Sequence, residues 1–109
     1  MNDPIFIFQT NGTYTGYVDN GYLYTRDGFF LGWVENDNSV YDRKGNYRGR
    51  LSAIGSNHYI LKNRFVLSPL PKPPVVDPPT HQPVPPQNSV APVTPTIGME
   101  DAFRVWGVS

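Results

Sequence analysis

Few side chains in this sequence have the type and spacing of a catalytic or metal site. The two histidines, His58 and His81, have no Asp or Glu near them in a metal-ligand pattern. The acidic turn at residues 35–38 lacks the twelve-residue spacing of a calcium loop. The chain also contains no phosphate-binding loop, nucleophile elbow or dinucleotide fingerprint. We therefore predict that the protein is not an enzyme and has no catalytic residues, metal ligands or cofactor.

Two aromatic-rich features point to binding instead. Arg43, Lys44, Arg48 and Arg50 alternate with tyrosines over residues 41–50, an arrangement that single-stranded nucleic-acid binders use. The nine basic and nine acidic residues of the chain cancel, however, so a nucleic-acid partner is not expected. The many Tyr and Trp residues would also suit a carbohydrate-binding surface, although a chain this small needs aromatics first for its core.

Composition limits the setting in which the protein works. It has no cysteine, which excludes disulfides and thiolate metal sites. Residues 1–10 lack the basic and long apolar regions of a signal peptide, and no run of about 18 apolar residues predicts a membrane span. We expect a cytoplasmic protein with no membrane partner. Its zero net charge removes colloidal repulsion and favours self-association.

The prolines divide the chain into three parts. Eleven of the twelve prolines lie between Pro69 and Pro95, whereas thirteen of the fifteen aromatic residues lie at or before Phe65. We expect a compact domain over residues 1–70, a proline-rich arm over 71–95 and a short C-terminal piece over 96–109. The arm contains Pro-x-x-Pro spacings that suit a partner's groove, but a semi-rigid polyproline spacer is the simpler interpretation.

Four similar segments follow one another in the first 70 residues. Their aromatic anchors, 16, 17 and 18 residues apart, are Phe8, Tyr24, Tyr41 and Tyr59. Gly or Asn follows each anchor after four residues and an aromatic after six; in three copies Gly follows after eight and Val or Leu after ten. Gly and Asn adopt left-handed backbone angles easily. We therefore predict a type I turn closed by a glycine bulge in all four copies.

Each copy is thus expected to be a β-hairpin, and the fold to be all-β, with four short hairpins around a pseudo-fourfold axis. Alternation along the second strands places the aromatic, the glycine and the Val or Leu on one face, which we assign to the core. Glycine weakens a strand, so its repetition at Gly16, Gly32 and Gly49 predicts close backbone approach. Leu67 replaces it in the fourth copy, where it could fill a gap.

The second copy has an unusual outer face. That face carries Phe29, Leu31 and Trp33, whereas the other copies place mainly polar residues there. An exposed apolar patch usually marks an interface. Such a patch on one hairpin of four requires a covering surface.

The C-terminal piece, residues 96–109, could supply this covering surface. Thr96 and Gly107 are suitable first and last residues of a short amphipathic helix, with Met99, Phe103 and Trp106 on one apolar stripe. We predict that this stripe or a neighbouring subunit covers the patch. The predicted interaction residues are Phe29, Leu31, Trp33, Phe103 and Trp106.

Residues 21–51, GYLYTRDGFFLGWVENDNSVYDRKGNYRGRL, resemble the bacterial four-fold β-flower proteins. The most distinctive part is the LGWV stretch followed by VYD and two spaced glycines, and the proline-rich segment and the MEDAFRVW end fit the same layout. The resemblance implies hairpin petals around a central axis. It implies no established activity, so no functional residues carry over.

Two functions therefore stay open. The first is a non-enzymatic assembly or protein-interaction module that binds its own copies or a protein partner. The alternative is a small-ligand binder of carbohydrate type that uses surface aromatics.

Overall fold

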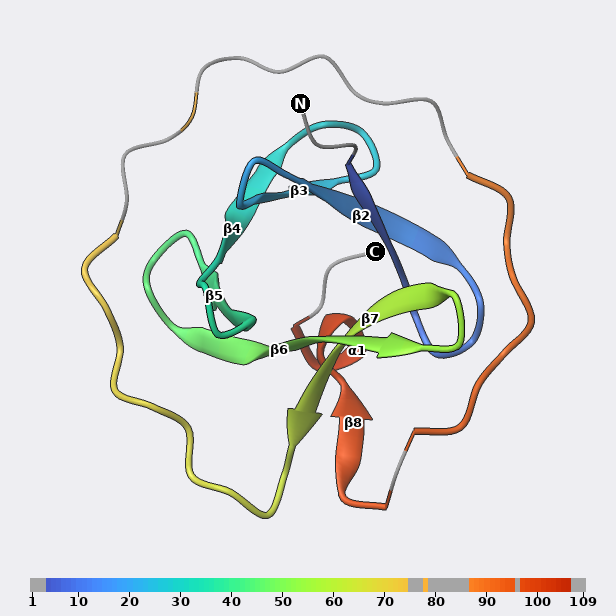
Figure 1. The fold of residues 1–109 in the computed structure, drawn as a ribbon. Coiled ribbons are helices and arrows are strands. Elements are labelled where there is room, and N and C mark those ends of the chain that lie inside the picture. The colour runs from blue at the N-terminus through green and yellow to red at the C-terminus, as the bar shows by residue number, and fades with distance from the viewer. Residues whose placement is uncertain (1–3, 75–77, 79–86, 96, 107–109) are drawn as a thin grey trace.

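The computed structural model describes residues 4–74, 78, 87–95 and 97–106. They form short strands and one short helix, arranged around a central axis (Figure 1). In chain order the elements are β1 (Ile5–Phe8), β2 (Tyr14–Asp19), β3 (Tyr22–Thr25), β4 (Phe30–Val34), β5 (Ser39–Asp42), β6 (Tyr47–Ile54), β7 (Asn57–Asn63), β8 (Met99–Asp101) and α1 (Ala102–Trp106).

The strands form one sheet that closes on itself. Each strand pairs antiparallel with the next along the chain, and β1 also pairs parallel with β7 through Ile7 and His58. Seven strands thereby make a closed barrel, while β8 extends the sheet outward from β7. The predicted all-β class with petals around an axis and a short C-terminal helix is confirmed.

The turns of the first three hairpins have the same geometry. In each, the amide of the turn glycine donates to the carbonyl three residues earlier at 2.8 to 2.9 Å, and the glycine has a φ of 90° to 95°. This is a type I turn closed by a glycine bulge. The glycines are Gly12, Gly28 and Gly45. The predicted turn is therefore confirmed for three copies.

A second bulge changes the predicted face of the aromatic in each hairpin. The pairing skips one residue just after the second-strand aromatic in each hairpin, namely Thr15, Leu31 and Arg48. An extra residue flips the parity of the residues after it in the strand. The aromatics therefore face outward while the glycines and the Val or Leu face the barrel interior, so the assignment of all three to one core face was wrong.

The barrel interior is aliphatic. It holds the fully buried Ile7, Leu23, Val40 and Ile60, which occupy equivalent places around the axis. Phe103 of α1 is also fully buried and packs against this cluster. The helix therefore belongs to the same core as the barrel.

Other aromatic rings on the outside of the barrel stack in pairs between neighbouring hairpins. Tyr17 of β2 stacks on Tyr24 of β3 with ring centroids 5.2 Å apart, and Trp33 of β4 stacks on Tyr41 of β5 at 5.5 Å. Each pair joins strands of two successive hairpins. Stacked rings of this kind contribute about 0.5–1.5 kcal/mol beyond their buried area.

The strand glycines allow the hairpins to approach one another. A Cβ at any of them would overlap a backbone carbonyl of the next hairpin's strands. The overlaps are Gly16 with Tyr24, Gly32 with Tyr41 and Gly49 with Leu61. The predicted close approach is confirmed, and it lies between neighbouring strands.

The fourth pair departs from the repeat. Residues 65–70, expected to be its second strand, make no strand, and Leu67 fills no gap because it is 94% exposed. The strand that pairs with β7 is instead β8, with Leu61 opposite Asp101 and Asn63 opposite Met99. The missing second strand is therefore supplied from the far end of the chain.

The helix begins later than expected. The carboxylate of Asp101 accepts a hydrogen bond from the amide of Phe103 at 3.1 Å, which makes Asp101 the capping residue. Met99 lies in β8, so it cannot share a helical stripe with Phe103 and Trp106. Thr96 and Gly107, the predicted ends, lie outside the described residues.

The described parts of the proline-rich segment run around the outside of the ring (Figure 1). Near its start, the amide of Lys72 donates to the carbonyl of Gly45 at 2.9 Å. Near its end, the amide of Val90 donates to the carbonyl of Gly12 at 2.9 Å. The segment thus docks onto the turns of the third and first hairpins.

Candidate functional site

The structure distributes the five predicted interaction residues over three environments. Phe103 is fully buried and Trp33 is 6% exposed. Leu31 and Trp106 are half-buried, and both pack against the interior cluster. Phe29, in the turn before β4, is 70% exposed. They do not make one continuous surface.

Trp33 is covered by its own chain. Its ring lies nearly parallel to Tyr41, and its indole N–H donates to Glu35 Oε2 at 3.1 Å. The Lys72 ammonium pairs with the Glu35 carboxylate and lies 5.0 Å from the centroid of the Tyr41 ring. The hydrogen bond with Glu35 raises the pKa of Lys72. The beginning of the proline-rich segment is therefore fastened beside the ring pair that buries Trp33.

Leu31 and the helix lie on the same hollow, and the covering of Leu31 by the helix stays a prediction. Phe103 and Trp106 stack at 5.6 Å, and Leu31 and Trp106 line a hollow of about 420 Å³. The Arg48 guanidinium lies 5.1 Å from the centroid of the Trp106 ring. The cationic contact of Arg48 holds the end of the helix against the third hairpin.

The two buried carboxylates hold the backbone. Asp42 accepts hydrogen bonds from the amides of Lys44 at 2.9 Å and Asn46 at 3.0 Å and from Arg48 Nε at 3.0 Å. Burial alone would raise the pKa of Asp42, but these donors outweigh it and hold the pKa below its usual value. Asp101 accepts from the amide of Thr10 at 2.7 Å besides capping α1.

These carboxylates therefore serve the fold. Within the described ranges, no group of three or more His, Asp or Glu side chains gathers where a metal ion could bind. In the same part of the chain, no helix is long and apolar enough to cross a membrane.

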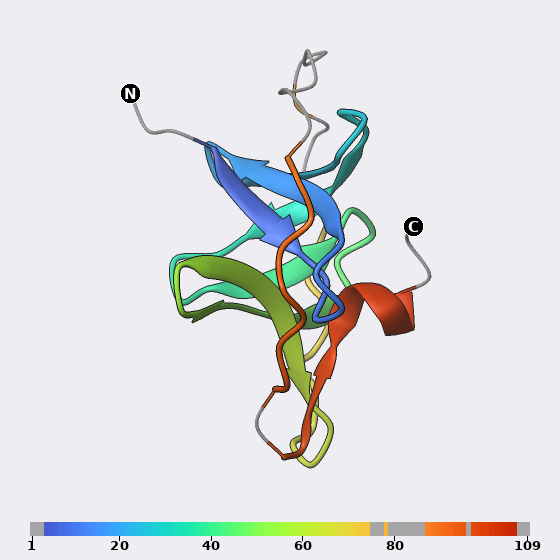
Figure 2. The ribbon, with the colours of Figure 1, turned by 90° about the vertical axis from the view of Figure 1, so that its right-hand side faces the viewer.

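Among the described residues, five of the six exposed large apolar side chains follow β7 or precede β8. They are Phe65 (74% exposed), Val66 (62%), Leu67 (94%), Leu70 (85%) and Ile97 (92%). The far ends of β7 and β8 project beyond the ring in both ribbon views (Figures 1 and 2). We call these five residues the apolar tip.

Sequence reasoning missed the apolar tip because it assigned residues 65–70 to a hairpin. The signal was present, since Leu67 and Pro69 break the repeat. A proline has no amide to donate to a sheet ladder. Apolar side chains without a strand to place them stay exposed unless something covers them.

Charges of both signs border the apolar tip. Arg64 precedes Phe65, and its guanidinium lies 5.5 Å from the centroid of that ring. Lys62 of β7 lies opposite Glu100 of β8. Arg64, Glu100, Asp101 and Arg104 contribute to a hollow of about 530 Å³ beside β8. The tip is therefore an apolar surface with a rim of mixed charge.

Petals of paired strands around one axis, without a clustered set of reactive side chains in the described ranges, define a small β-flower scaffold. The chain matches the family model described as "4-fold beta flower protein" over residues 2–100, and it belongs to this family. No enzymatic activity is known for the family, and its function is not established. No curated protein and no solved structure matches the chain.

Proposed function

We propose that this protein is a non-enzymatic assembly module that associates with a second copy of itself through the apolar tip. The observation that supports the proposal is the run of exposed large apolar side chains from Phe65 to Leu70, with Ile97 beside it. Monomeric proteins rarely expose a continuous apolar patch of more than a few hundred Å². Burying these side chains would contribute about 25 cal/mol for each Å² removed from water.

A second copy is the favoured partner because the tip complements itself. In a twofold contact the same surface of both copies is buried. A residue of one copy then contacts a different residue of the second copy, and the reverse contact also forms. The rim carries Lys62 and Arg64 together with Glu100, so opposite charges can meet across such an axis. The chain's zero net charge adds no repulsion between copies.

The edge of β8 offers backbone groups for the same contact. Among the described strands, β8 pairs only with β7, so its other edge faces no strand. An uncovered edge is a template for pairing with another chain. Apolar side chains beside an open edge are a combination that favours association between copies.

The proposed site of action is the cytoplasm. A chain without cysteine gains nothing from an oxidising compartment.

Light scattering coupled to size exclusion, over a range of concentrations, tests the proposal. We expect a mass above the 12.3 kDa of one chain that rises with concentration. The double variant Leu67→Ser/Leu70→Ser should return to the monomer mass, because both side chains are exposed and their loss leaves the core intact.

Phe29→Ser is the matched control, since Phe29 is also a largely exposed apolar residue but lies on another hairpin. It should keep the mass of the unchanged protein. A monomer at every concentration, or a loss of association in Phe29→Ser and not in the double variant, would overturn the proposal.

A further inference from the structure

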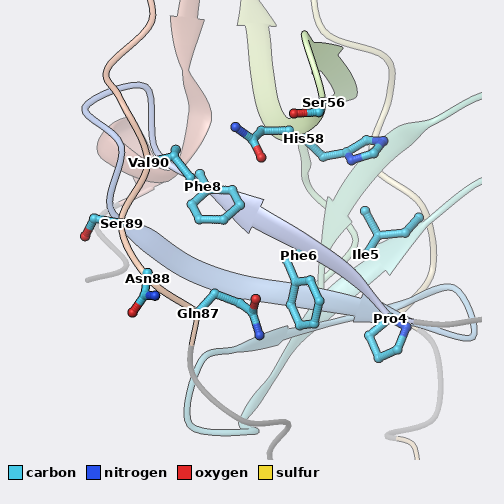
Figure 3. Close-up of a pocket in the computed structure, with 11 residues that line it drawn as sticks. Pro4, Ile5, Phe6, Phe8, Ser56, His58, Gln87, Asn88, Ser89 and Val90 are labelled. Atoms are coloured by element: carbon cyan, nitrogen blue, oxygen red, sulfur yellow. The ribbon is translucent and has the colours of Figure 1, made fainter.

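A second feature of the surface, separate from the apolar tip, is a cavity of about 440 Å³ (Figure 3). It lies between β1, the turn that joins β6 to β7, and residues 87–90 of the proline-rich segment. Small-molecule sites have volumes of about 300–1,000 Å³. The cavity is large enough for a small ligand.

The wall made by the proline-rich segment is held in place. Val90 and Val93 donate from their amides to the carbonyls of Gly12 at 2.9 Å and Thr10 at 2.8 Å. Both valines also pack against a buried cluster that contains Phe8. A Cβ at Gly12 would overlap the carbonyl oxygen of Val90, so the close contact requires glycine. A wall fixed in advance lowers the ordering cost of binding.

One side of the cavity is aromatic and apolar. Phe6 is half-buried and Phe8 is 5% exposed, and both rings line it (Figure 3). Tyr14 packs against both rings, at centroid distances of 6.0 and 5.8 Å. Burial raises the pKa of Tyr14 to about 12, as expected for a poorly solvated environment. Phe6, the more exposed of the two rings, offers an aromatic surface to an apolar ligand face.

Polar side chains line the rest of the cavity together with Pro4, Ile5 and Val90. Three amide side chains, Asn57, Gln87 and Asn88, line it together with two serines and His58. An amide side chain both donates and accepts hydrogen bonds, and so does a neutral imidazole. No Asp, Glu, Lys or Arg is among the described residues that line the cavity. A phosphate or carboxylate would therefore find no Lys or Arg side chain there.

From this geometry we infer that the cavity binds a neutral saccharide unit, with one face of the sugar ring on Phe6 and its hydroxyl groups on Asn57 and Asn88. A pyranose has C–H groups on its faces and hydroxyls around its rim, which matches an aromatic floor bordered by donors and acceptors. This site is independent of self-association, because none of its lining residues belongs to the apolar tip.

Saturation-transfer NMR with the full chain tests the inference. The probes are glucose, galactose, maltose and lactose, with glucose 6-phosphate and glucuronic acid as charged counterparts. We expect transfer to at least one neutral sugar and at least ten-fold weaker binding of its charged counterpart.

Two variants locate the site. Phe6→Ala and Asn88→Ala should each weaken binding of that sugar at least ten-fold. Asn88 is exposed, so its variant leaves the fold intact even if Phe6→Ala loses stability. The matched controls, Phe29→Ala and Asn36→Ala, change an exposed Phe and an exposed Asn elsewhere and should bind as the unchanged protein does.

The inference is overturned if no neutral sugar receives saturation, if the charged sugars bind as well as the neutral ones, or if Asn88→Ala binds normally. Self-association is read from mass and sugar binding from magnetisation transfer. Failure of one proposal is therefore distinguishable from failure of the other.

Discussion

The first three petals and the fourth follow different rules. In hairpins β1–β2, β3–β4 and β5–β6, both strands and the turn come from one short stretch of chain, and the turn glycine has nearly the same φ each time. In the fourth petal, β7 pairs with β8, which follows the whole proline-rich segment. Three petals are closed locally, and one is closed by the end of the chain.

The difference shows how a repeat protein can close its ring. Closing a local hairpin costs little conformational entropy, because the loop is short. Pairing with a distant strand costs more, and burial of apolar side chains must offset that cost. The strand β8 leads directly into α1, whose Phe103 enters the barrel interior. The fourth petal is therefore stabilised by a side chain in the common core rather than by its turn.

The largest predicted effect comes from removing that side chain. Phe103→Ala should lower the free energy of unfolding by about 3–5 kcal/mol, because Phe103 is fully buried. Urea unfolding followed by circular dichroism measures the change. A loss below about 1 kcal/mol would mean that the helix is not part of the core.

The contact between locally closed petals gives the next largest effect. Gly32→Val should cost about 1–3 kcal/mol or more, since its Cβ would overlap the carbonyl oxygen of Tyr41. Thermal unfolding compares it with Gly55→Ala, where the Cβ meets open space and only the φ of 62° opposes the change. Equal costs for the two variants would contradict close packing between petals.

The sequence predicts the local petals well for a physical reason. Their turns depend on a glycine at a fixed spacing, which can be counted, and the strand glycines mark real close approach. The extra residue at each bulge, such as Leu31, cannot be counted in this way, so the aromatic before it was assigned to the wrong face. Trp33, after the bulge, lies on the predicted outer face, where its ring stacks on Tyr41.

The fourth petal and the candidate sites could not be predicted in the same way. The strand β7 could pair with residues 65–70 or with residues 99–101, and it pairs with residues 99–101. Local sequence patterns predict the nearer segment, because a short loop costs less closure entropy. The nearer segment forms no strand, so its apolar side chains stay exposed and make up most of the apolar tip. Residues 87–90 of the proline-rich segment form one wall of the cavity beside Phe6. The composition of that segment does not indicate where the segment docks on the barrel.

A smaller effect is expected from the carboxylate that holds the third turn. Asp42→Asn should cost about 1–2 kcal/mol, because it weakens charge-assisted hydrogen bonds to a buried acceptor. The folded-state pKa of Asp42 is lowered, so its contribution is present above the unfolded value of 3.8 and is lost as the pH falls through the folded value.

Unfolding measured from pH 6 down to about pH 2 checks this sign. The unchanged protein should lose more stability over that range than Asp42→Asn does. Parallel curves for the two proteins would show that Asp42 does not titrate with folding.

The smallest effect concerns the proline-rich segment. Lys72→Ala should change stability by less than about 1 kcal/mol, because the pair with Glu35 is exposed. It should nevertheless increase quenching of Trp33 fluorescence by acrylamide, a neutral quencher, since Lys72 and Glu35 lie beside the Trp33–Tyr41 pair. Unchanged quenching in Lys72→Ala would show that the segment does not shield this ring pair.

Amide hydrogen exchange at low protein concentration tests the central claim, closure of the fourth petal by β8, most directly. We predict that the β8 amides that bond to β7, and that of Arg64, which donates to the carbonyl of Gly98 at 2.9 Å, exchange as slowly as those of β2 and β3. The amides of Leu67, Ser68 and Leu70 should exchange fast, because these residues are exposed and belong to no strand. Slow exchange at Leu67 and Ser68 with fast exchange throughout β8 would contradict the account, because the fourth petal would then be a local hairpin like the other three.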